Sequence, residues 1–294
     1  MTTTGDVDAG SPTEAAGSRE SFGARLAAAM RDRGPLCAGI DPHRGLLRSW
    51  DLPVTVAGLE RFAMTTVEAL AGEVAVLKPQ SAFFEVFGSA GIAVLEKVLA
   101  ACAEAGALTL LDVKRGDIGS TMSAYAEAYL ADGAPLAADA ITVSPFLGFG
   151  SLAPALDLAA ATGRGVFVLA LTSNAEGPQV QHAVGAGGVV IAQQIADAAA
   201  ARNAGALPLG SVGLVVGATI GATGVRLGRV NGPMLAPGIG AQGATPADLR
   251  TVFGDDLSAV LPSSSREILG AGPSVTGLRD AARRTVEQVR AALG

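Results

Sequence analysis

The sequence predicts an α/β fold, a single (β/α)8 barrel, on three observations. Short apolar segments alternate eight times with longer alanine- and leucine-rich stretches, as expected for parallel strands joined by helices. The length of 294 residues is close to that of a typical eight-stranded barrel. Polar residues follow nearly every apolar segment, where barrels assemble their sites: Asp41, Lys78, Lys114, Ser144, Ser173, Thr219, Gln242 and Arg266. A doubly wound open sheet is the rival architecture, and this last observation favours the barrel.

Each predicted strand is a short β-rich run, and each predicted helix is a longer stretch with helical composition. The strands are expected at residues 36–41, 74–79, 108–114, 140–144, 166–172, 212–219, 233–238 and 257–262. The helices are expected at 55–71, 89–105, 120–131, 151–161, 184–203, 246–253 and 275–293. Thr245 as a cap and Pro246 in the first turn mark the start of the helix at 246–253. The last helix is amphipathic.

The first 20 residues are polar, carry acidic side chains and contain no apolar core of a secretory signal. We therefore expect a disordered tail at 1–20 and one barrel domain at 21–294. No apolar run reaches the roughly 18 residues that a membrane helix needs, so no membrane partner is expected. The net charge of −6 and the lack of a Lys/Arg cluster give no reason to expect a nucleic-acid partner.

The cysteines and histidines are too few for a disulfide framework or a typical histidine-rich metal site. Cys37 and Cys102 are the two cysteines, and their number fits a reducing cytoplasm. His43 and His182 are the two histidines, and no metal is expected. The simplest interpretation of His43 is a surface histidine.

An acid, a base and an acid lie within six positions at the end of the third predicted strand: Asp112, Lys114 and Asp117. Because residues two apart in a strand share a face, Asp112 and Lys114 should lie side by side at the inner rim, with Asp117 in the following loop. Flanking carboxylates hold a lysine as an ammonium, which is a poor Schiff-base nucleophile but a good proton donor to a developing carbanion. A structural ion-pair network at the strand end is the alternative.

Two segments after the seventh and eighth predicted strands together indicate a phosphate site. Residues 237–243, Pro-Gly-Ile-Gly-Ala-Gln-Gly, offer backbone N–H groups and the side-chain amide of Gln242. Residues 263–267, Ser-Ser-Ser-Arg-Glu, offer hydroxyls and the guanidinium of Arg266. Each motif alone is weak, since a glycine-rich turn is usually only a turn. Barrels frequently bind phosphate with the loops in these two places.

Other polar residues at the strand ends suit a sugar and a heterocycle. Asp41 and Lys78 would face each other across the barrel mouth and grip sugar hydroxyls, although each taken singly reads as a solvated or paired charge. Thr172, Ser173 and Asn174 after the fifth strand can hydrogen-bond the edge of a heterocycle, although such residues are usually turn formers. The phenylalanines in 83–88 are expected to pack in apolar surroundings, and an aromatic ring lying over a ligand is the alternative.

The segment Asp-Val-Lys-Arg-Gly-Asp-Ile-Gly-Ser-Thr, residues 112–121, resembles the D-x-K-x-x-D-I-x-x-T signature of the orotidine 5′-phosphate decarboxylase family. The motifs GIDP, LKPQSAFFE, TVSPFLG, TSN, PGIGAQG and SSSRE occur in the order typical of its longer bacterial subgroup, and the resemblance covers roughly 35–290. Two segments depart from the family pattern: Ala175 stands where proline is frequent, and Ser144-Pro145-Phe146 stands where Asn-Pro-Tyr is frequent.

The resemblance implies a homodimeric TIM-barrel lyase, without metal or cofactor, that converts orotidine 5′-monophosphate to UMP and carbon dioxide in pyrimidine biosynthesis. Lys114 would protonate C6 of the pyrimidine, and Asp112 would lie against the departing carboxylate. Asp117 and Thr121 would reach into the site of the partner subunit. The remaining substrate contacts that the resemblance implies are Asp41 and Lys78 to the ribose, Ser173 to the pyrimidine, and Gln242 and Arg266 to the phosphate.

Three other functions remain open at this point. A Schiff-base aldolase would use Lys114 as its nucleophile and would be trapped by borohydride. A metal-dependent decarboxylase of a keto-sugar phosphate would lose activity in EDTA. A non-catalytic nucleotide-binding barrel is a third alternative, but binding alone does not require the charged set of Asp112, Lys114 and Asp117.

Overall fold

Eight parallel strands close into a barrel in the computed structural model, which describes residues 19–185, 187–238, 245–254 and 257–294. Each strand pairs with the next, and β8 returns to pair with β1. The strands are β1 (Cys37–Ile40), β2 (Val76–Pro79), β3 (Leu108–Arg115), β4 (Ala140–Val143), β5 (Gly165–Leu171), β6 (Val212–Val216), β7 (Met234–Pro237) and β8 (Val260–Ser264). The predicted (β/α)8 barrel is confirmed, and every predicted strand overlaps an observed one.

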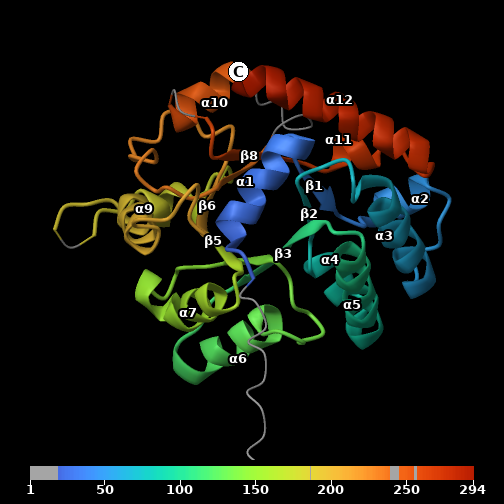
Figure 1. The fold of residues 1–294 in the computed structure, drawn as a ribbon, viewed down its shortest axis with the longest axis horizontal. Coiled ribbons are helices and arrows are strands. Elements are labelled where there is room, and N and C mark those ends of the chain that lie inside the picture. Colours follow the sequence, from blue (N-terminus) through green and yellow to red (C-terminus); the bar gives the residue numbers. More distant parts are fainter. Residues whose placement is uncertain (1–18, 186, 239–244, 255–256) are drawn as a thin grey trace, which may run out of the picture.

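Helices surround this barrel and separate its strands (Figure 1). Those that match predicted helices are α3 (Val56–Leu70), α5 (Gly88–Glu104), α6 (Gly119–Leu130), α7 (Ala153–Ala161), α9 (Ile191–Arg202), α10 (Pro246–Phe253) and α12 (Val275–Leu293). Further helices occur at α1 (Phe22–Arg33), α2 (Arg44–Ser49), α4 (Ala82–Glu85), the 3₁₀ turn η1 (Phe149–Leu152), α8 (Pro178–Gln181) and α11 (Arg266–Leu269). Thr245 caps α10, as expected, by accepting the N–H of Asp248.

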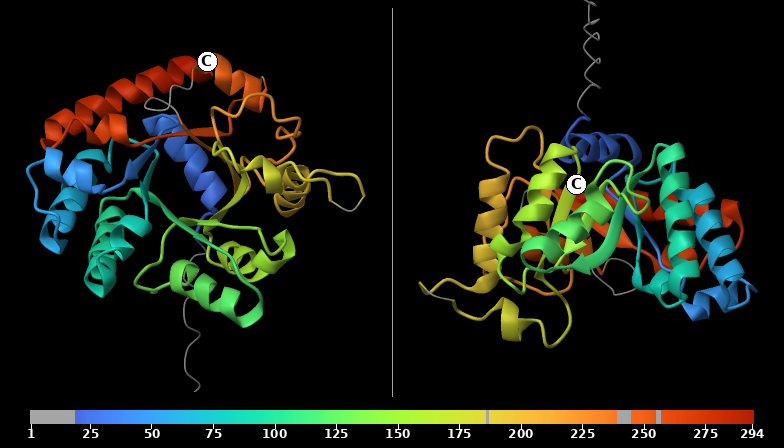
Figure 2. Two further views of the ribbon diagram at one scale, coloured as in Figure 1. Left: turned by 180° about the vertical axis from the view of Figure 1, so that it is seen from behind. Right: turned by 90° about the horizontal axis from the view of Figure 1, so that it is seen from below.

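The predicted helix at 184–203 was wrong in its first seven residues. Helix α9 begins only at Ile191, and a backbone bridge pairs Val184 with Val190 before it. Gly187 and Gly188 both have positive φ values, which a helix does not allow. This segment forms part of the loop that projects from the barrel beside α9 in Figures 1 and 2.

Helix α1 closes one end of the barrel, opposite the end where the β-to-α loops lie (Figure 2). The ring of Phe22 in this helix packs edge-on against Phe167 of β5, with 5.9 Å between the ring centroids. A Cβ atom at position 165 would collide with the Phe22 ring, so glycine there permits the close approach. Ser21 caps the helix start, and Gly34, at φ 89°, ends it.

Two apolar layers hold the fold together. The inner layer fills the barrel with Leu108, Leu110, Phe167 and Leu261, and α1 seals it. The outer layer, which includes Leu111 and Val113, packs the strands against the helices. The alternation along β3 therefore matches the prediction that Leu108 and Leu110 point inward. A fully packed interior leaves only the open end of the barrel for polar side chains.

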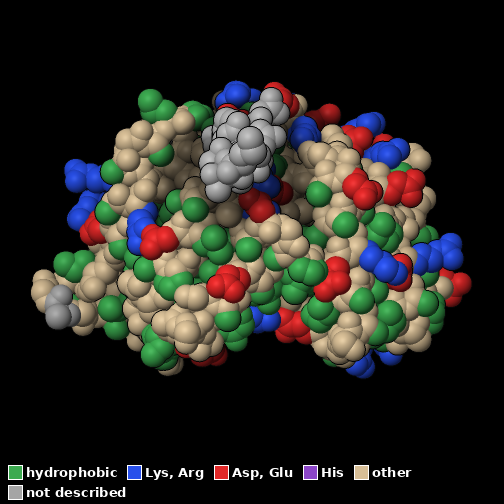
Figure 3. Space-filling view, turned by 60° about the horizontal axis from the view of Figure 1, so that its bottom comes forward, with side chains coloured by type: hydrophobic (Ala, Val, Ile, Leu, Met, Phe, Trp, Pro, Cys, Tyr) green, Lys and Arg blue, Asp and Glu red, His purple; other side chains and the backbone are tan. Residues whose placement is uncertain are grey.

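Basic and acidic side chains are interspersed on the face shown in Figure 3, so this face has no patch of one charge sign. Within the described residues, no helix has the length and apolar character needed to cross a bilayer. Most of the predicted tail, residues 1–18, lies outside the described part of the chain. Arg19 is described, and its guanidinium lies 3.0 Å from a carboxylate oxygen of Asp132.

Candidate active site

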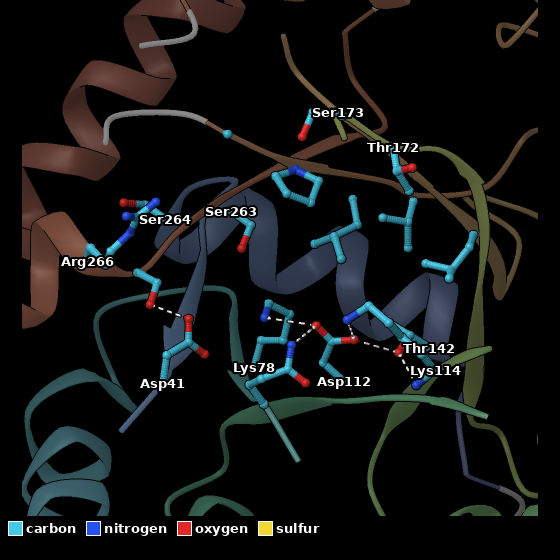
Figure 4. Close-up of a pocket in the computed structure, with 18 of the residues that line it drawn as sticks. Asp41, Lys78, Asp112, Lys114, Thr142, Thr172, Ser173, Ser263, Ser264 and Arg266 are labelled. Carbon is cyan, nitrogen blue, oxygen red and sulfur yellow. Dashed lines mark hydrogen bonds and ion pairs between the residues drawn. The ribbon is translucent and has the colours of Figure 1, made fainter. Parts of the chain in front are cut away.

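A cavity of about 540 Å³ opens at the carboxyl ends of the strands (Figure 4). Its volume lies within the usual range for small-molecule sites. One wall is apolar and comes from β5, β6 and β7 with Leu169, Leu171, Val215, Leu235 and Pro237. The opposite wall is polar and comes from the first four strands and from β8. The cavity can therefore bind a flat ring on one side and charged or hydroxyl groups on the other.

Asp112 of β3 is the centre of the polar wall and receives hydrogen bonds from four side chains. Its Oδ1 accepts from Lys114 Nζ at 2.6 Å and from Thr142 Oγ1 at 2.7 Å. Its Oδ2 accepts from Gln80 Nε2 at 2.8 Å and from Lys78 Nζ at 3.4 Å. Burial alone would raise the pKa of Asp112, but the two ammonium groups outweigh burial and lower the pKa to about 2. This carboxylate is consequently ionised at neutral pH and fixed in orientation.

Lys78 of β2 lies between two carboxylates, as Figure 4 shows. Its side chain is only 9% exposed, and burial by itself would lower its pKa. The charges of Asp41 and Asp112 outweigh that effect and hold the pKa of Lys78 above its usual value. Lys78 is therefore a permanently charged ammonium in the floor of the cavity. Asp41, which follows β1, accepts a hydrogen bond from Ser265 Oγ at 2.5 Å through Oδ2, whereas its buried Oδ1 has no hydrogen-bond partner within the described structure.

Lys114 differs from Lys78 in its exposure and in its backbone. Its side chain is 46% exposed and reaches into the cavity from the rim. Its φ of 46° lies in the left-handed region that long side chains rarely adopt. The pairing of β3 with β4 is irregular at this point, between Leu111 and Arg115. Lys114 thus lies in the irregular end of β3 and turns its ammonium back toward the carboxylate two residues earlier.

Asp117 and Thr121, which the sequence grouped with the site, do not line this cavity in the described structure. Asp117 lies in the loop before α6, and its Oδ1 accepts the N–H of Ile118 at 2.8 Å. Among the described residues, the ion pair of Lys114 is with Asp112, and none links it to Asp117. Thr121 lies exposed in the first turn of α6.

The side of the cavity expected to bind phosphate contains Arg266 and the serines that precede it. Arg266, Ser263, Ser264 and Ser265 all line the cavity at the end of β8. The Oγ atom of Ser264 is buried, and it has no hydrogen-bond partner in the part of the chain that is described. Ser173 lines the cavity from the loop after β5, as predicted. Gln242, the other predicted phosphate contact, lies outside the described residues.

Sequence reasoning missed several residues that the fold brings to this cavity. Gln80 and Thr142 both bind Asp112, and neither stood out in the sequence. His43 is exposed, as expected, but it also lines the cavity and packs at a tilted angle against Phe83, with 4.1 Å between the ring centroids. By contrast, Ser144, which also follows a strand, does not line the cavity.

Neither metal-ligating clusters nor reactive thiols appear in the described structure. No group of three or more His, Cys, Asp or Glu side chains among the described residues could hold a metal ion. Cys37 and Cys102 are buried and free. Burial raises the pKa of each thiol to about 12, so both are protonated at neutral pH.

Comparisons with known proteins all indicate one family. Residues 34–281 match the orotidine 5′-phosphate decarboxylase / HUMPS family. The orotidine 5′-phosphate decarboxylase of Salinispora arenicola is 65% identical over 274 residues, which cover 93% of this chain and 99% of that protein. The enzyme of the same name from Streptomyces coelicolor is 60% identical over the same shares. The crystal structure of a candidate orotidine 5′-phosphate decarboxylase from Streptomyces avermitilis superposes with a TM-score of 0.91 at 60% identity, covering 94% of this chain and 97% of that one.

Proposed function

Because the chain belongs to the orotidine 5′-phosphate decarboxylase / HUMPS family, we propose that it converts orotidine 5′-monophosphate to UMP and carbon dioxide, the last step of de novo UMP synthesis. One observation of the site carries the proposal. The ammonium of Lys114 lies 2.6 Å from Asp112, whose carboxylate stays ionised, at the mouth of a nucleotide-sized cavity. This arrangement holds a proton donor in position before substrate arrives.

Lys114 is the proton donor in the proposed reaction. The bond from C6 of the pyrimidine to its carboxylate breaks, and the electron pair stays on C6. A proton from Lys114 Nζ then forms the new C–H bond, and the half-exposed amine regains a proton from solvent. The ammonium also stabilises the developing negative charge at C6 before the transfer, so the proposed step needs neither metal nor cofactor.

Asp112 keeps this ammonium aimed, and Lys78 keeps Asp112 charged. Asp112 lies against the place where the substrate carboxylate departs, and the buried ammonium of Lys78 balances its charge. A carboxylate with four donors cannot turn away when the substrate enters. The site is thus organised before binding, as electrostatic catalysis requires.

The rest of the cavity suits the other parts of the nucleotide. The apolar wall of β5, β6 and β7 accepts the faces of the pyrimidine, and Ser173 hydrogen-bonds its polar edge. The carboxylate of Asp41, which lines the cavity beside the ammonium of Lys78, is an acceptor for a ribose hydroxyl. Arg266 and Gln242 bind the phosphate, which supplies binding energy far from the reacting bond.

The enzyme acts as a homodimer in this proposal, with Asp117 and Thr121 completing the site of the partner subunit. The segments after β2, β3 and β4 support this assembly because they expose large apolar side chains: Val86, Ile118, Phe146 and Leu147. Phe146 is 76% exposed, which is unfavourable for an isolated chain in water. We place the enzyme in the cytoplasm, where its two free thiols stay reduced.

The direct test is the loss of orotidine 5′-monophosphate absorbance on addition of the purified protein in the presence of EDTA. We expect release of carbon dioxide and formation of UMP in equal amounts. Inhibition by EDTA would indicate a metal-dependent decarboxylase instead. Covalent trapping of substrate on Lys114 by borohydride would indicate a Schiff-base enzyme. Binding of UMP without any turnover would indicate a non-catalytic nucleotide-binding barrel.

A further inference from the structure

The backbone of Lys114 occupies a conformation that lysine does not favour. Its φ of 46° is left-handed, and a non-glycine residue pays a steric penalty there. Between the pairs Leu111–Ile141 and Arg115–Val143, β3 advances four residues while β4 advances two. Residues in such conformations persist only where neighbouring groups hold them, and they concentrate at functional sites.

Thr142 of β4 lies opposite this irregular turn. Its hydroxyl contacts two groups of β3, the backbone N–H of Lys114 and the carboxylate of Asp112. Its hydroxyl accepts the backbone N–H of Lys114 at 3.0 Å. The same hydroxyl donates to Asp112 Oδ1 at 2.7 Å, the oxygen that also accepts from the Lys114 ammonium. Thr142 is 1% exposed, so water does not compete for either bond. One oxygen atom thus connects the turn that carries the lysine to the carboxylate that orients it.

We propose that Thr142 is a positioning residue for proton transfer, an inference that rests on the proposed function. Its hydroxyl holds the left-handed turn of Lys114 in register with Asp112, so that the ammonium points at the reacting carbon. A valine has the same shape but no hydroxyl. It would leave the N–H of Lys114 without this acceptor and Asp112 with one donor fewer, while the cavity keeps its volume.

The chain contains a matched control for the loss of such a hydroxyl. Thr109, which lies in β3, is 3% exposed. Its hydroxyl donates to Asp139 Oδ2 and accepts the N–H of Asp139, both at 3.1 Å. Thr109 therefore makes the same two kinds of bond as Thr142, to a carboxylate and to a backbone N–H. It does not line the cavity, so its replacement should affect the fold and not the reaction.

The test compares Thr142→Val, Thr142→Ser and Thr109→Val in the same decarboxylation assay, with urea unfolding and UMP affinity measured for each. We expect Thr142→Val to lower kcat about tenfold to a hundredfold, which is the rate equivalent of one hydrogen bond to a charged group. KM and UMP affinity should stay close to those of the wild type, because the hydroxyl of Thr142 is bonded to the Lys114 N–H and to Asp112 and is not among the predicted substrate contacts. Thr142→Ser should restore most of kcat, and Thr109→Val should lose stability but keep kcat.

Several outcomes would overturn the proposal. They are wild-type kcat in Thr142→Val, an equal loss of kcat in Thr109→Val, or a failure of Thr142→Ser to recover activity. If Thr142→Val does not fold, Thr142→Ala takes its place, with the same expectation of low kcat beside an active Thr142→Ser. A wild-type protein that releases no carbon dioxide refutes the proposed function. An active wild type with an equally active Thr142→Val refutes only the role of Thr142.

Discussion

Alanine substitution of the two lysines that contact Asp112 should affect two different properties of the protein. Lys78→Ala should lower its stability, and Lys114→Ala should abolish its turnover. Lys78 is 9% exposed and balances the charges of Asp41 and Asp112. Lys78→Ala would leave two carboxylates at the cavity floor without this buried ammonium. Removing one partner of a buried ion pair typically costs about 3–5 kcal/mol. That is a large part of the roughly 5–15 kcal/mol by which domains are stable, so we expect a markedly lower free energy of unfolding.

Lys114→Ala should leave the fold nearly intact and abolish turnover. The Lys114 side chain is 46% exposed, and pairs in contact with water contribute only about 0–1 kcal/mol. Asp112 would keep its bonds from Lys78, Gln80 and Thr142. Its charge therefore remains compensated, but no ammonium is left to protonate C6. The variant should still bind UMP.

Urea unfolding followed by circular dichroism measures the first effect, and the absorbance assay measures the second. Lys97→Ala is the control, because Lys97 pairs with Glu60 on the surface at 2.7 Å and should change neither quantity. Equal unfolding free energies for Lys78→Ala and Lys114→Ala would refute the argument from burial. Near-normal decarboxylation by Lys114→Ala would remove the proposed proton donor.

Three further predictions concern the phosphate, the partner subunit and pH. Arg266→Ala should lower kcat/KM for orotidine 5′-monophosphate about tenfold to a hundredfold, and much less for the unphosphorylated nucleoside; equal losses would make Arg266 structural. Lys114→Ala and Asp117→Ala, each inactive alone, should recover about a quarter of wild-type activity after subunit exchange in an equal mixture, since half the dimers are mixed and half of their sites are intact. No recovery would mean that each site uses its own Asp117. The pKa of Asp112 is about 2 in the fold and about 3.9 in an unfolded chain, so its stabilisation is present above pH 4 and is lost as the pH falls toward 2. Near pH 3 the wild type should lose roughly 1 kcal/mol per pH unit more than Asp112→Asn in urea unfolding, and parallel losses would contradict the lowered pKa.

The strands and the charged residues could be predicted because each leaves a local signal. An aspartate and a lysine are conspicuous at the end of an apolar run, as Asp112 and Lys114 are. Thr142 leaves no such signal, because a threonine within a strand reads as an ordinary β-former. Its role depends on its register with a residue 28 positions earlier, which only the pairing of β3 and β4 reveals.

Helix α1 was not predicted, although its sequence carries the signals of a helix. Phe22, Leu26 and Ala29 have helical spacing and are all buried, and Ser21 and Gly34 mark the ends of the helix. Its alignment across the barrel, by contrast, depends on tertiary contacts such as the hydrogen bond from the Gly23 N–H to Ser211 Oγ, 188 residues away.

The pairing of β1 with β8 has a consequence for the order in which the protein and its site come into being. Cys37 pairs with Ser263, and Ala38 pairs with Ser264, so the barrel closes only when the last strand meets the first. The hydroxyl of Ser265 donates a hydrogen bond to Asp41 between the ends of these two strands, beside Arg266. A growing chain on the ribosome therefore cannot bind nucleotide until nearly all of it has emerged. Once bound, a nucleotide with its ribose on Asp41 and its phosphate on Arg266 would tie the two ends of the barrel together and would stabilise the closed barrel relative to the unfolded chain.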